Sequence, residues 1–343
     1  MRQLLQWCYG SLLSLAGTLL PVQHANAILT ADCSASMSPS IINVSTAITP
    51  SNADSANINA TLNYTCKNTD LLLSMKVSVC LSADGGDYNP SIISPRFLKN
   101  TLNNSRLAFN MTLPGDTVWG TASGSIYKSV VHTIAPKNSI SVDVPIKISL
   151  IPNNDNKLAT LGAYINNFNT SGTAITYADR LLPILSTPDC LTDVIKEKKP
   201  LLFTVQAKVV PSCVINATSD INLGSHSANQ TNIVGSNNNA INTTCTNNTS
   251  YYIGLSPSNG NINGAGMMSG TGSNTDKVPY QLRSTAGSAG TIWGNTATST
   301  TVGNGLASTG TGVAQSQTVY VTVPSADVTP DNYSDTVTIR VNY

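Results

Sequence analysis

The chain has 343 residues, a formal net charge of +1 at pH 7, and only 10% charged against 41% hydrophobic residues. This near balance excludes the strong electrostatic attraction with which proteins bind nucleic acids or anionic membrane surfaces. Asn, Ser, Thr and Gly fill the positions between apolar residues, a composition typical of a secreted β-protein whose surface carries hydroxyl and amide groups.

Residues 1–27 have the pattern of a secretory signal peptide. Arg2 is their only charge, an apolar stretch covers residues 12–20, and Ala25-Asn26-Ala27 provides a cleavage site. We therefore expect a mature protein that begins at Ile28 and is exported from the cytoplasm. No later segment has the ~20 continuous apolar residues of a membrane-spanning helix, so the mature protein is expected to be soluble.

Two copies of one pattern follow. In each copy two cysteines lie 33 or 32 positions apart, and the second cysteine closes an alternating apolar run. Short strands separated by Gly, Asn, Ser and Pro, without a helical period, predict an all-β fold with two β-sandwiches in tandem. The corresponding segments of the two copies are 58–66 and 241–245, 73–79 and 251–255, 97–111 and 267–282, 118–120 and 292–294, and 140–150 and 319–323.

The boundary between the copies is predicted at the densest charge run, residues 196–200. This divides the mature chain into an N-terminal domain at 28–195, a linker at 196–200 and a C-terminal domain at 201–343. Apolar residues alternate with polar ones from Phe203 to Val209, and we expect this run to form the first strand of the C-terminal domain.

Six cysteines remain after cleavage, and an even number in an oxidising compartment predicts three disulfides. Six cysteines permit 15 pairings. Residues 151–195, which contain one of these cysteines, have no counterpart in the second copy, and the strand that completes the first domain is expected there at Leu181–Leu185. The repeat narrows the pairings to Cys33–Cys66, Cys213–Cys245 and, by elimination, Cys80–Cys190.

The last segment, Asp335–Tyr343, alternates strictly between apolar and polar residues, so we expect a strand with one buried and one exposed face. No strand follows it in the sequence. Because the unpaired edge of a strand invites pairing with another chain, the ending predicts assembly by strand exchange. The apolar members of this strand are Val337, Ile339, Val341 and Tyr343.

Residues 201–343 resemble the spore coat U domain of bacterial secreted pilins. The resemblance rests on the run from Phe203 to Cys213, on the cysteine pair closed by Cys245, and on the ending from Thr329 to Tyr343. A chain that adds a second, N-terminal domain resembles the tip adhesin of archaic, Csu-type chaperone-usher pili, which attach cells to surfaces and promote biofilm formation.

This resemblance implies two immunoglobulin-like sandwiches, the second lacking its last strand. A periplasmic chaperone would lend that strand, and the N-terminal extension of the adjacent pilin subunit would replace it at the outer-membrane usher. Val337, Ile339 and Val341 would line the acceptor groove, and basic residues of the chaperone would hold the carboxylate of Tyr343. Only Ile28 to Asp32 precede Cys33, too few for a donor strand of ~10 residues. The subunit is thus expected to accept a strand, to donate none, and to stand at the pilus tip.

An adhesive tip needs exposed apolar loops, whose target would be an abiotic or host surface. Trp119 is repeated by Trp293, and Phe97-Leu98 by Met267-Met268, so we expect these residues to be structural. Segments without a counterpart are better candidates, although a strand or packed loop competes with that interpretation. The candidate contact residues are Ile92, Ile93, Leu158, Leu161, Ala163, Tyr164 and Ile165.

No enzyme is expected. Neither His132 nor His226 lies in a catalytic motif, and no Gly-x-Ser-x-Gly or paired-carboxylate signature occurs. Without Cys-x-x-Cys and without a calcium loop at 84–87 or 153–156, no metal or cofactor is expected either. The alternatives to an apolar adhesin are a lectin-like tip that binds sugars and a plain structural pilin of the shaft.

Overall fold

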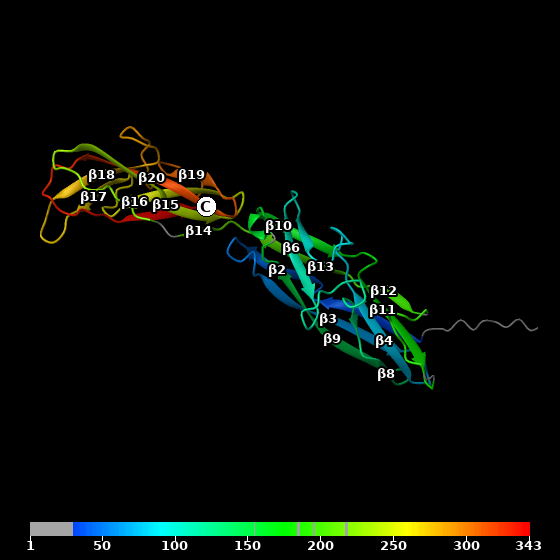
Figure 1. Ribbon diagram of the computed structural model, residues 1–343. Coiled ribbons are helices and arrows are strands. Elements are labelled where there is room, and N and C mark those ends of the chain that lie inside the picture. The colour runs from blue at the N-terminus through cyan, green and yellow to red at the C-terminus, as the bar shows by residue number, and fades with distance from the viewer. Residues whose placement is uncertain (1–29, 154, 184–185, 195, 217–218) are drawn as a thin grey trace, which may run out of the picture.

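The computed structural model describes residues 30–343, except residues 154, 184–185, 195 and 217–218. The predicted signal peptide and the two residues Ile184 and Leu185 of the predicted completing strand lie outside this description. Two β-sandwiches lie end to end (Figure 1). Among the described residues, helical structure is limited to the single turn η1 (Asn156–Leu158), and no helix there is long and apolar enough to cross a membrane.

The first sandwich contains an eight-stranded and a five-stranded sheet. The larger sheet has the order β1-β3-β9-β6-β5-β10-β13-β2, and the smaller has β12-β11-β4-β7 with β8 also paired to β4. Their bounds are β1 (Ala31–Ser38), β2 (Ile41–Ile48), β3 (Asn57–Asn68), β4 (Met75–Ser82), β5 (Arg96–Asn100), β6 (Arg106–Thr112), β7 (Tyr127–Lys128), β8 (His132–Ile134), β9 (Ser139–Leu150), β10 (Gly162–Phe168), β11 (Ala174–Leu181), β12 (Glu197–Pro200) and β13 (Phe203–Val209).

The second sandwich is smaller, with a five-stranded sheet in the order β14-β15-β20-β18-β17 and a three-stranded sheet in the order β19-β16-β21. The predicted fold class, all-β with two tandem immunoglobulin-like sandwiches, is confirmed. The bounds are β14 (Cys213–Asn216), β15 (Thr231–Cys245), β16 (Ser250–Pro257), β17 (Ala265–Ser269), β18 (Lys277–Arg283), β19 (Leu306–Thr309), β20 (Ala314–Ser325) and β21 (Val337–Asn342).

The internal repeat is present in three dimensions. Each sandwich contains a buried tryptophan whose Nε1 donates to a strand carbonyl, Trp119 to Leu81 at 2.9 Å and Trp293 to Ile253 at 2.8 Å. These contacts show that β4 of the first sandwich corresponds to β16 of the second. They also support the structural role expected for both tryptophans. The three predicted disulfides, Cys33–Cys66, Cys80–Cys190 and Cys213–Cys245, are all confirmed.

The strand Phe203–Val209 corrects the predicted domain boundary. It was expected to open the second sandwich, but β13 pairs antiparallel with β10 and parallel with β2, both strands of the first. The predicted linker at 196–200 contains β12, which pairs with β11 of the first sandwich. The connection between the sandwiches is therefore the short segment Val210–Ser212.

The reason is the apolar face of β13. Leu201, Phe203, Val205, Ala207 and Val209 all pack in the first core with at most 5% of their surface exposed. The ring of Phe203 stacks on Phe168 at 4.4 Å between centroids. Alternation correctly indicated a strand with one buried face, but it did not specify which of the two cores receives that face.

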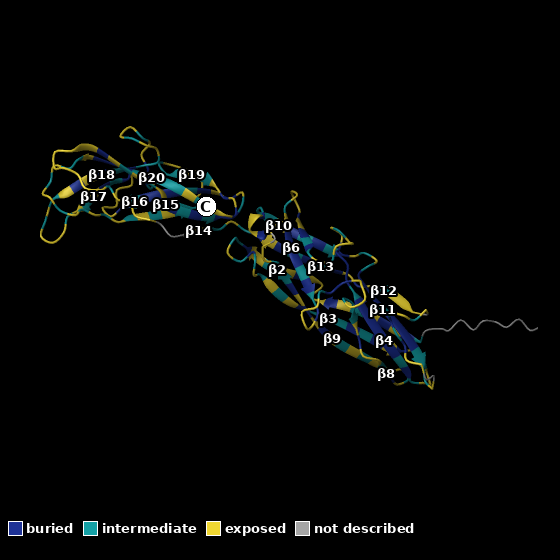
Figure 2. Cartoon of the chain, in the orientation of Figure 1, coloured by how far each residue is buried: buried dark blue, intermediate teal, exposed yellow. Residues whose placement is uncertain are grey.

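The first domain is therefore completed by β12 in the smaller sheet and β13 in the larger one, and the prediction of a completing strand at Leu181–Leu185 is wrong. Leu181 instead ends β11, paired with Met75 of β4. The disulfide Cys80–Cys190 ties the segment between β11 and β12 to β4, as expected for the extra segment. Figure 2 shows β4 and β11 in the dark blue of buried residues and β12 in the yellow of exposed ones.

Replacing Phe203 should unfold the first sandwich preferentially. We expect Phe203→Ala to lower the free energy of unfolding of the first domain by about 3–5 kcal/mol, because a buried aromatic ring leaves a cavity. Urea unfolding followed by the fluorescence of Trp119, which lies 6.1 Å from the Phe203 ring, measures the change.

Lys208→Ala is the matched control, since Lys208 is the exposed neighbour on the same strand. Equal unfolding midpoints for the two variants would contradict the assignment of β13 to the first core.

Candidate functional site

The structure places Tyr164 in the first core and not at the surface. Its side chain is fully buried, and its hydroxyl donates to the carbonyl of Thr160 at 2.7 Å and to Ser105 Oγ at 2.9 Å. The expectation that Tyr164 contacts a target is therefore wrong, because alternation along β10 turns it inward. Ala163 and Ile165 face outward on the same strand, and Leu161 packs partly against the core.

Leu158 lies where the two sandwiches meet. Asn247 Nδ2 donates to the Leu158 carbonyl at 2.5 Å, and Thr160 forms an isolated bridge with Asn247. Gly312, at φ +82°, approaches so closely that an added Cβ would lie 2.1 Å from the carbonyl oxygen of Lys157. This segment has no counterpart in the second copy because it is a contact between the domains, a role that the sequence did not suggest.

Ile92 and Ile93 lie in the loop between β4 and β5. Ile92 is exposed, whereas the Ile93 carbonyl accepts a hydrogen bond from Arg96 at 2.8 Å. The Arg96 guanidinium is buried and also donates to the carbonyls of Ala83 and Asp84. Burial lowers the pKa of Arg96 to about 10, and Asp84 partly offsets this effect. The two isoleucines remain predicted contact residues.

The most exposed apolar run of the first domain is the loop between β3 and β4, which the sequence analysis missed. Leu71, Leu72 and Leu73 are consecutive and expose 65%, 86% and 44% of their surfaces. We name residues 69–74 the leucine loop. Its last residues had been assigned to the following strand, which in the structure begins only at Met75.

Hydrogen bonds fix the backbone of the leucine loop. The Asp70 carboxylate accepts from the amides of Leu72 at 2.8 Å and Leu73 at 2.7 Å. These bonds hold the pKa of Asp70 below its usual value. The buried Asn68 donates from Nδ2 to the carbonyls of Leu73 at 2.9 Å and Ile134 at 3.0 Å. The loop thus presents its leucines from a fixed frame.

The leucine loop lies at the end of the first sandwich opposite the second. Its base is bonded to β8, which Figure 1 shows far from the second sandwich. The equivalent loop of the second copy, between β15 and β16, is shorter and contains Asn247, the residue that contacts Leu158. The same position in the fold thus serves as a contact between domains in one copy and projects into solvent in the other.

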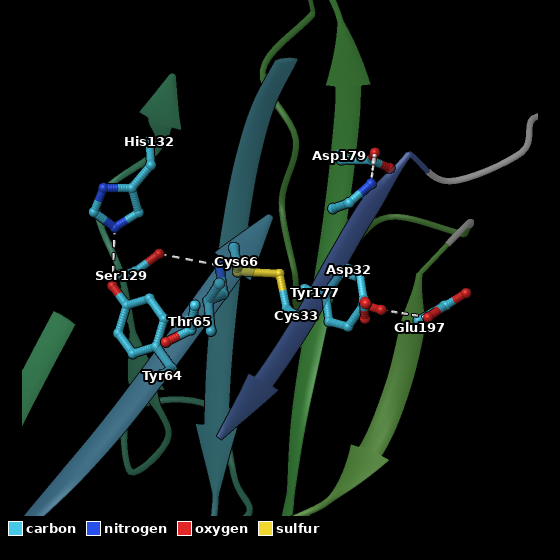
Figure 3. Close-up of a disulfide and its surroundings, with 12 residues drawn as sticks. Asp32, Cys33, Tyr64, Thr65, Cys66, Ser129, His132, Tyr177, Asp179 and Glu197 are labelled. Carbon is cyan, nitrogen blue, oxygen red and sulfur yellow. Dashed lines mark hydrogen bonds between the residues drawn. A yellow bond between two sulfur atoms is a disulfide. The ribbon is translucent and has the colours of Figure 1, made fainter. Parts of the chain in front are cut away.

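Figure 3 shows the strands that support this end of the molecule. Cys33 and Cys66 join β1 to β3, and the Asp179 carboxylate accepts from the Ala31 amide at 2.7 Å. Tyr64 and His132 lie within hydrogen-bond distance, with 2.9 Å between the hydroxyl and Nε2. Burial lowers the pKa of His132 and raises that of Tyr64, so both side chains favour their neutral forms and share one hydrogen bond.

The second sandwich has an incompletely covered core along β21. This strand is the edge of its sheet and pairs with β16 alone. Val337, Ile339 and Val341 point toward the core but stay partly exposed, while Tyr343 is 50% exposed. On β11, the equivalent strand of the first domain, Ile175 and Tyr177 are fully buried.

Other apolar side chains of the second sandwich are also incompletely covered. Ile215 of β14 pairs in register with the buried Thr243 and is 37% exposed. Further along, Ile221 and Leu223 pack on the core but belong to no strand in the described part of the chain. The Asp220 carbonyl accepts a hydrogen bond from the Asn237 side chain, and the Leu223 carbonyl is hydrogen-bonded to the His226 ring.

In the first sandwich the equivalent position is filled. Ile41, the counterpart of Ile221 in the repeat, begins β2, and β13 pairs with β2 while β12 pairs with β11. In the second sandwich no described strand lies between β21 and residues 219–224. We call this position the strand slot. Val337, Ile339 and Val341, which the sequence predicted to line an acceptor groove, are the partly exposed residues of β21 beside it.

Residues 200–340 match the family model of the Spore Coat Protein U domain. The C-terminal domain is a spore coat protein U domain. The match begins at Pro200 and so includes β13, although in space this strand completes the first sandwich. The sequence that matches the family model therefore extends beyond the second sandwich, and its first strand belongs to the first sandwich of the same chain.

Solved structures of similar fold include pilus adhesins. The Acinetobacter baumannii CsuC-CsuE chaperone-tip adhesion subunit complex has 14% identity and a TM-score of 0.48, covering 91% of this chain and 100% of that chain. The CupB6 tip adhesin of Pseudomonas aeruginosa has 11% identity and a TM-score of 0.30, covering 90% and 94%. Among curated proteins none has a matching sequence. Identities this low transfer no function.

Carboxylates hold the entry to β21 in the spore coat protein U domain. Asp331 accepts from the Thr271 amide at 2.7 Å and from Asn274 Nδ2 at 2.8 Å, and hydrogen bonds from these two residues hold its pKa far below the usual range. Tyr280 donates to Asp335 at 2.6 Å. These contacts fix the start of one slot wall. Within the described residues no cluster of three or more His, Cys, Asp or Glu could hold a metal.

The pair formed by Tyr64 and His132 predicts a pH dependence of the first domain. Because burial lowers the pKa of folded His132, the unfolded chain takes up a proton first as the pH falls below about 6.5. The stability that neutral His132 contributes is therefore fully present above that pH. It is lost as the pH falls from there toward the pKa of His132 in the folded protein. Urea unfolding of the first domain between pH 8 and pH 5 measures this slope.

His132→Gln keeps an acceptor for the Tyr64 hydroxyl but does not titrate, so its slope over this interval should be smaller than that of the native protein. An unchanged slope would rule out His132 as the responsible group.

Proposed function

We propose that the protein is the tip adhesin subunit of an archaic chaperone-usher pilus and attaches cells to apolar abiotic surfaces through the leucine loop. The observation that carries this proposal is the exposure of Leu71, Leu72 and Leu73 on a hydrogen-bonded loop at the end farthest from the spore coat protein U domain. These leucines take the place of the buried Tyr164 among the proposed contact residues, and Ile92 and Ile93 remain candidates beside them.

Apolar adhesion follows from the physics of this loop. Burying a leucine side chain against an apolar surface contributes ~1.5–3 kcal/mol, and the effect has no directional requirement. A loop whose backbone is already fixed loses little conformational entropy on contact. Three such side chains per subunit, multiplied over many pili, give the avidity that attachment of a cell and biofilm formation require.

The strand slot would join the subunit to the fibre. A periplasmic chaperone first supplies an extended strand to the slot, and the N-terminal strand of the adjacent pilin subunit then replaces it at the outer-membrane usher. This mode of binding adds a strand whose main chain pairs with an open edge and whose alternate side chains fill apolar positions. Secretion through the periplasm and a place at the pilus tip follow from this route.

Changing one leucine should abolish attachment without affecting assembly. We expect Leu72→Asp to reduce binding of piliated cells to polystyrene at least tenfold, because a charged side chain cannot be buried against an apolar surface. Bound cells are counted at equal pilus number, determined by immunogold labelling.

Leu102→Asp provides a matched control, since Leu102 is 85% exposed but lies in the β5–β6 turn near the second domain. Equal loss for both variants would point to general surface hydrophobicity, and inhibition by a soluble sugar would favour a lectin.

A strand added in cis should stabilise the second domain. We expect a chain extended after Tyr343 by a short turn and a copy of residues 197–209 to fold without chaperone, because β12 and β13 fill the equivalent position of the first domain. Direction is respected, since the added strand would run antiparallel to β21, as β12 does to β11. Calorimetry should show a raised melting temperature for the second domain only.

The control extension replaces its inward residues, the counterparts of Phe203, Val205 and Ala207, by serine. If both extensions stabilise the second domain equally, or if the native chain already folds stably alone, the slot is not an acceptor.

A further inference from the structure

The polar residues at the base of the leucine loop form two successive turns held by side chains, at Asn68 and at Asp70. Asp70 uses one carboxylate oxygen, Oδ1, to accept from two successive leucine amides, while its own amide donates to Asn68 Oδ1 at 2.9 Å. Its carbonyl accepts from the Lys137 amide at 3.1 Å. One residue thereby connects the leucines to β3 and to the turn after β8.

The loop is tied down on its other side as well. Thr69 donates both its amide and its hydroxyl to the Thr30 carbonyl, at 2.9 and 2.7 Å. The Leu182 amide donates to the Ser74 carbonyl at 2.8 Å. Asn68, which has no exposed surface, bonds the Leu73 carbonyl. Each of these hydrogen bonds joins backbone groups or involves the buried Asn68 amide or the Thr69 hydroxyl. None involves a leucine side chain.

Such a frame opposes the collapse that three adjacent exposed leucines favour. Apolar side chains on a flexible loop lower their free energy by folding back onto the protein, which would hide them from any target. Main-chain bonds to a carboxylate and a buried amide fix the backbone direction and prevent this. Hydrogen bonds to charged groups are the stronger kind, and the Asp70 carboxylate is the only charge among these contacts.

We infer that Asp70 is a positioning residue that keeps the leucine loop in a contact-ready conformation, with Asn68 as its buried support. The inference rests on the proposed adhesive function. Asp70 contacts no target itself; it acts through the amides of Leu72 and Leu73. Its acceptor oxygen is what holds the two amides, and its charge strengthens these bonds without attracting the target surface, which distinguishes positioning from electrostatic attraction.

The test compares three variants of the full chain. Attachment is measured on assembled pili, and amide hydrogen exchange is measured on the corresponding chaperone complexes. Asp70→Ala removes the acceptor, Asp70→Asn keeps an acceptor oxygen without charge, and Asp116→Ala removes an exposed carboxylate from the turn after β6 as a control. Amide exchange of Leu72 and Leu73, the melting temperature of the first domain, and attachment to polystyrene are measured for each.

Asp70→Ala should accelerate exchange of both amides about tenfold or more, the ratio that loss of a charge-assisted bond produces, and should lower attachment several-fold. Its melting temperature should stay close to that of the native protein, because the loop lies outside the core. Asp70→Asn should retain most protection and attachment, and Asp116→Ala should retain both. Attachment by Asp70→Ala equal to that of Asp70→Asn would overturn the inference.

Failure of the proposed function itself is distinguishable. If Leu72→Asp attaches as well as the native protein, the leucines are not the contact and the adhesive proposal fails. If Leu72→Asp loses attachment while Asp70→Ala retains it, only the positioning role of Asp70 is wrong.

Discussion

Each sandwich can cover its core only if an extended strand fills one position. That position lies between β11, or its equivalent β21, and the segment that follows the first cysteine of the same copy. The requirement has two parts, because the strand must pair its amides and carbonyls and must also fill the core with alternate side chains. In the first domain β12 and β13 meet both, with the apolar face of β13 buried. In the second domain, Ile215, Ile221, Val337 and their neighbours stay partly exposed along the slot.

This constraint also gives the chain its polarity. The strand that completes the first sandwich leads through Val210–Ser212 directly into β14, so the end of one domain's core is the start of the next domain's sheet. The loop after the second cysteine of each copy then points the same way along the molecule. In the second copy it meets Leu158 of the first domain, whereas the leucine loop meets no further domain of the described chain.

Period-two patterns in the sequence predicted most strands, and the repeat between the two copies predicted the disulfides and the structural tryptophans. The sequence could not assign Phe203–Val209 to a core, since alternation is identical whichever sandwich buries it. Tyr164 and Leu72 show a related limit. Both side chains carry a large apolar part, yet that of Tyr164 is fully buried and that of Leu72 is 86% exposed. Only the hydrogen bonds made near each residue distinguish the two positions. The leucine loop was missed because its last leucine reads as the start of β4.

The two copies thus illustrate how one fold can host opposite solutions to the same problem of exposed apolar surface. Along β21, apolar side chains are partly exposed beside an edge that pairs with β16 alone, and in the proposed assembly an added strand would satisfy both the backbone and the core. On the leucine loop Asp70 and Asn68 already bond the amides of Leu72 and Leu73 and the Leu73 carbonyl, while the leucine side chains stay exposed. A loop whose backbone is bonded in this way offers no regular strand edge and favours contact through its side chains. That difference in backbone satisfaction, rather than hydrophobicity as such, separates the proposed site of assembly from the proposed site of attachment.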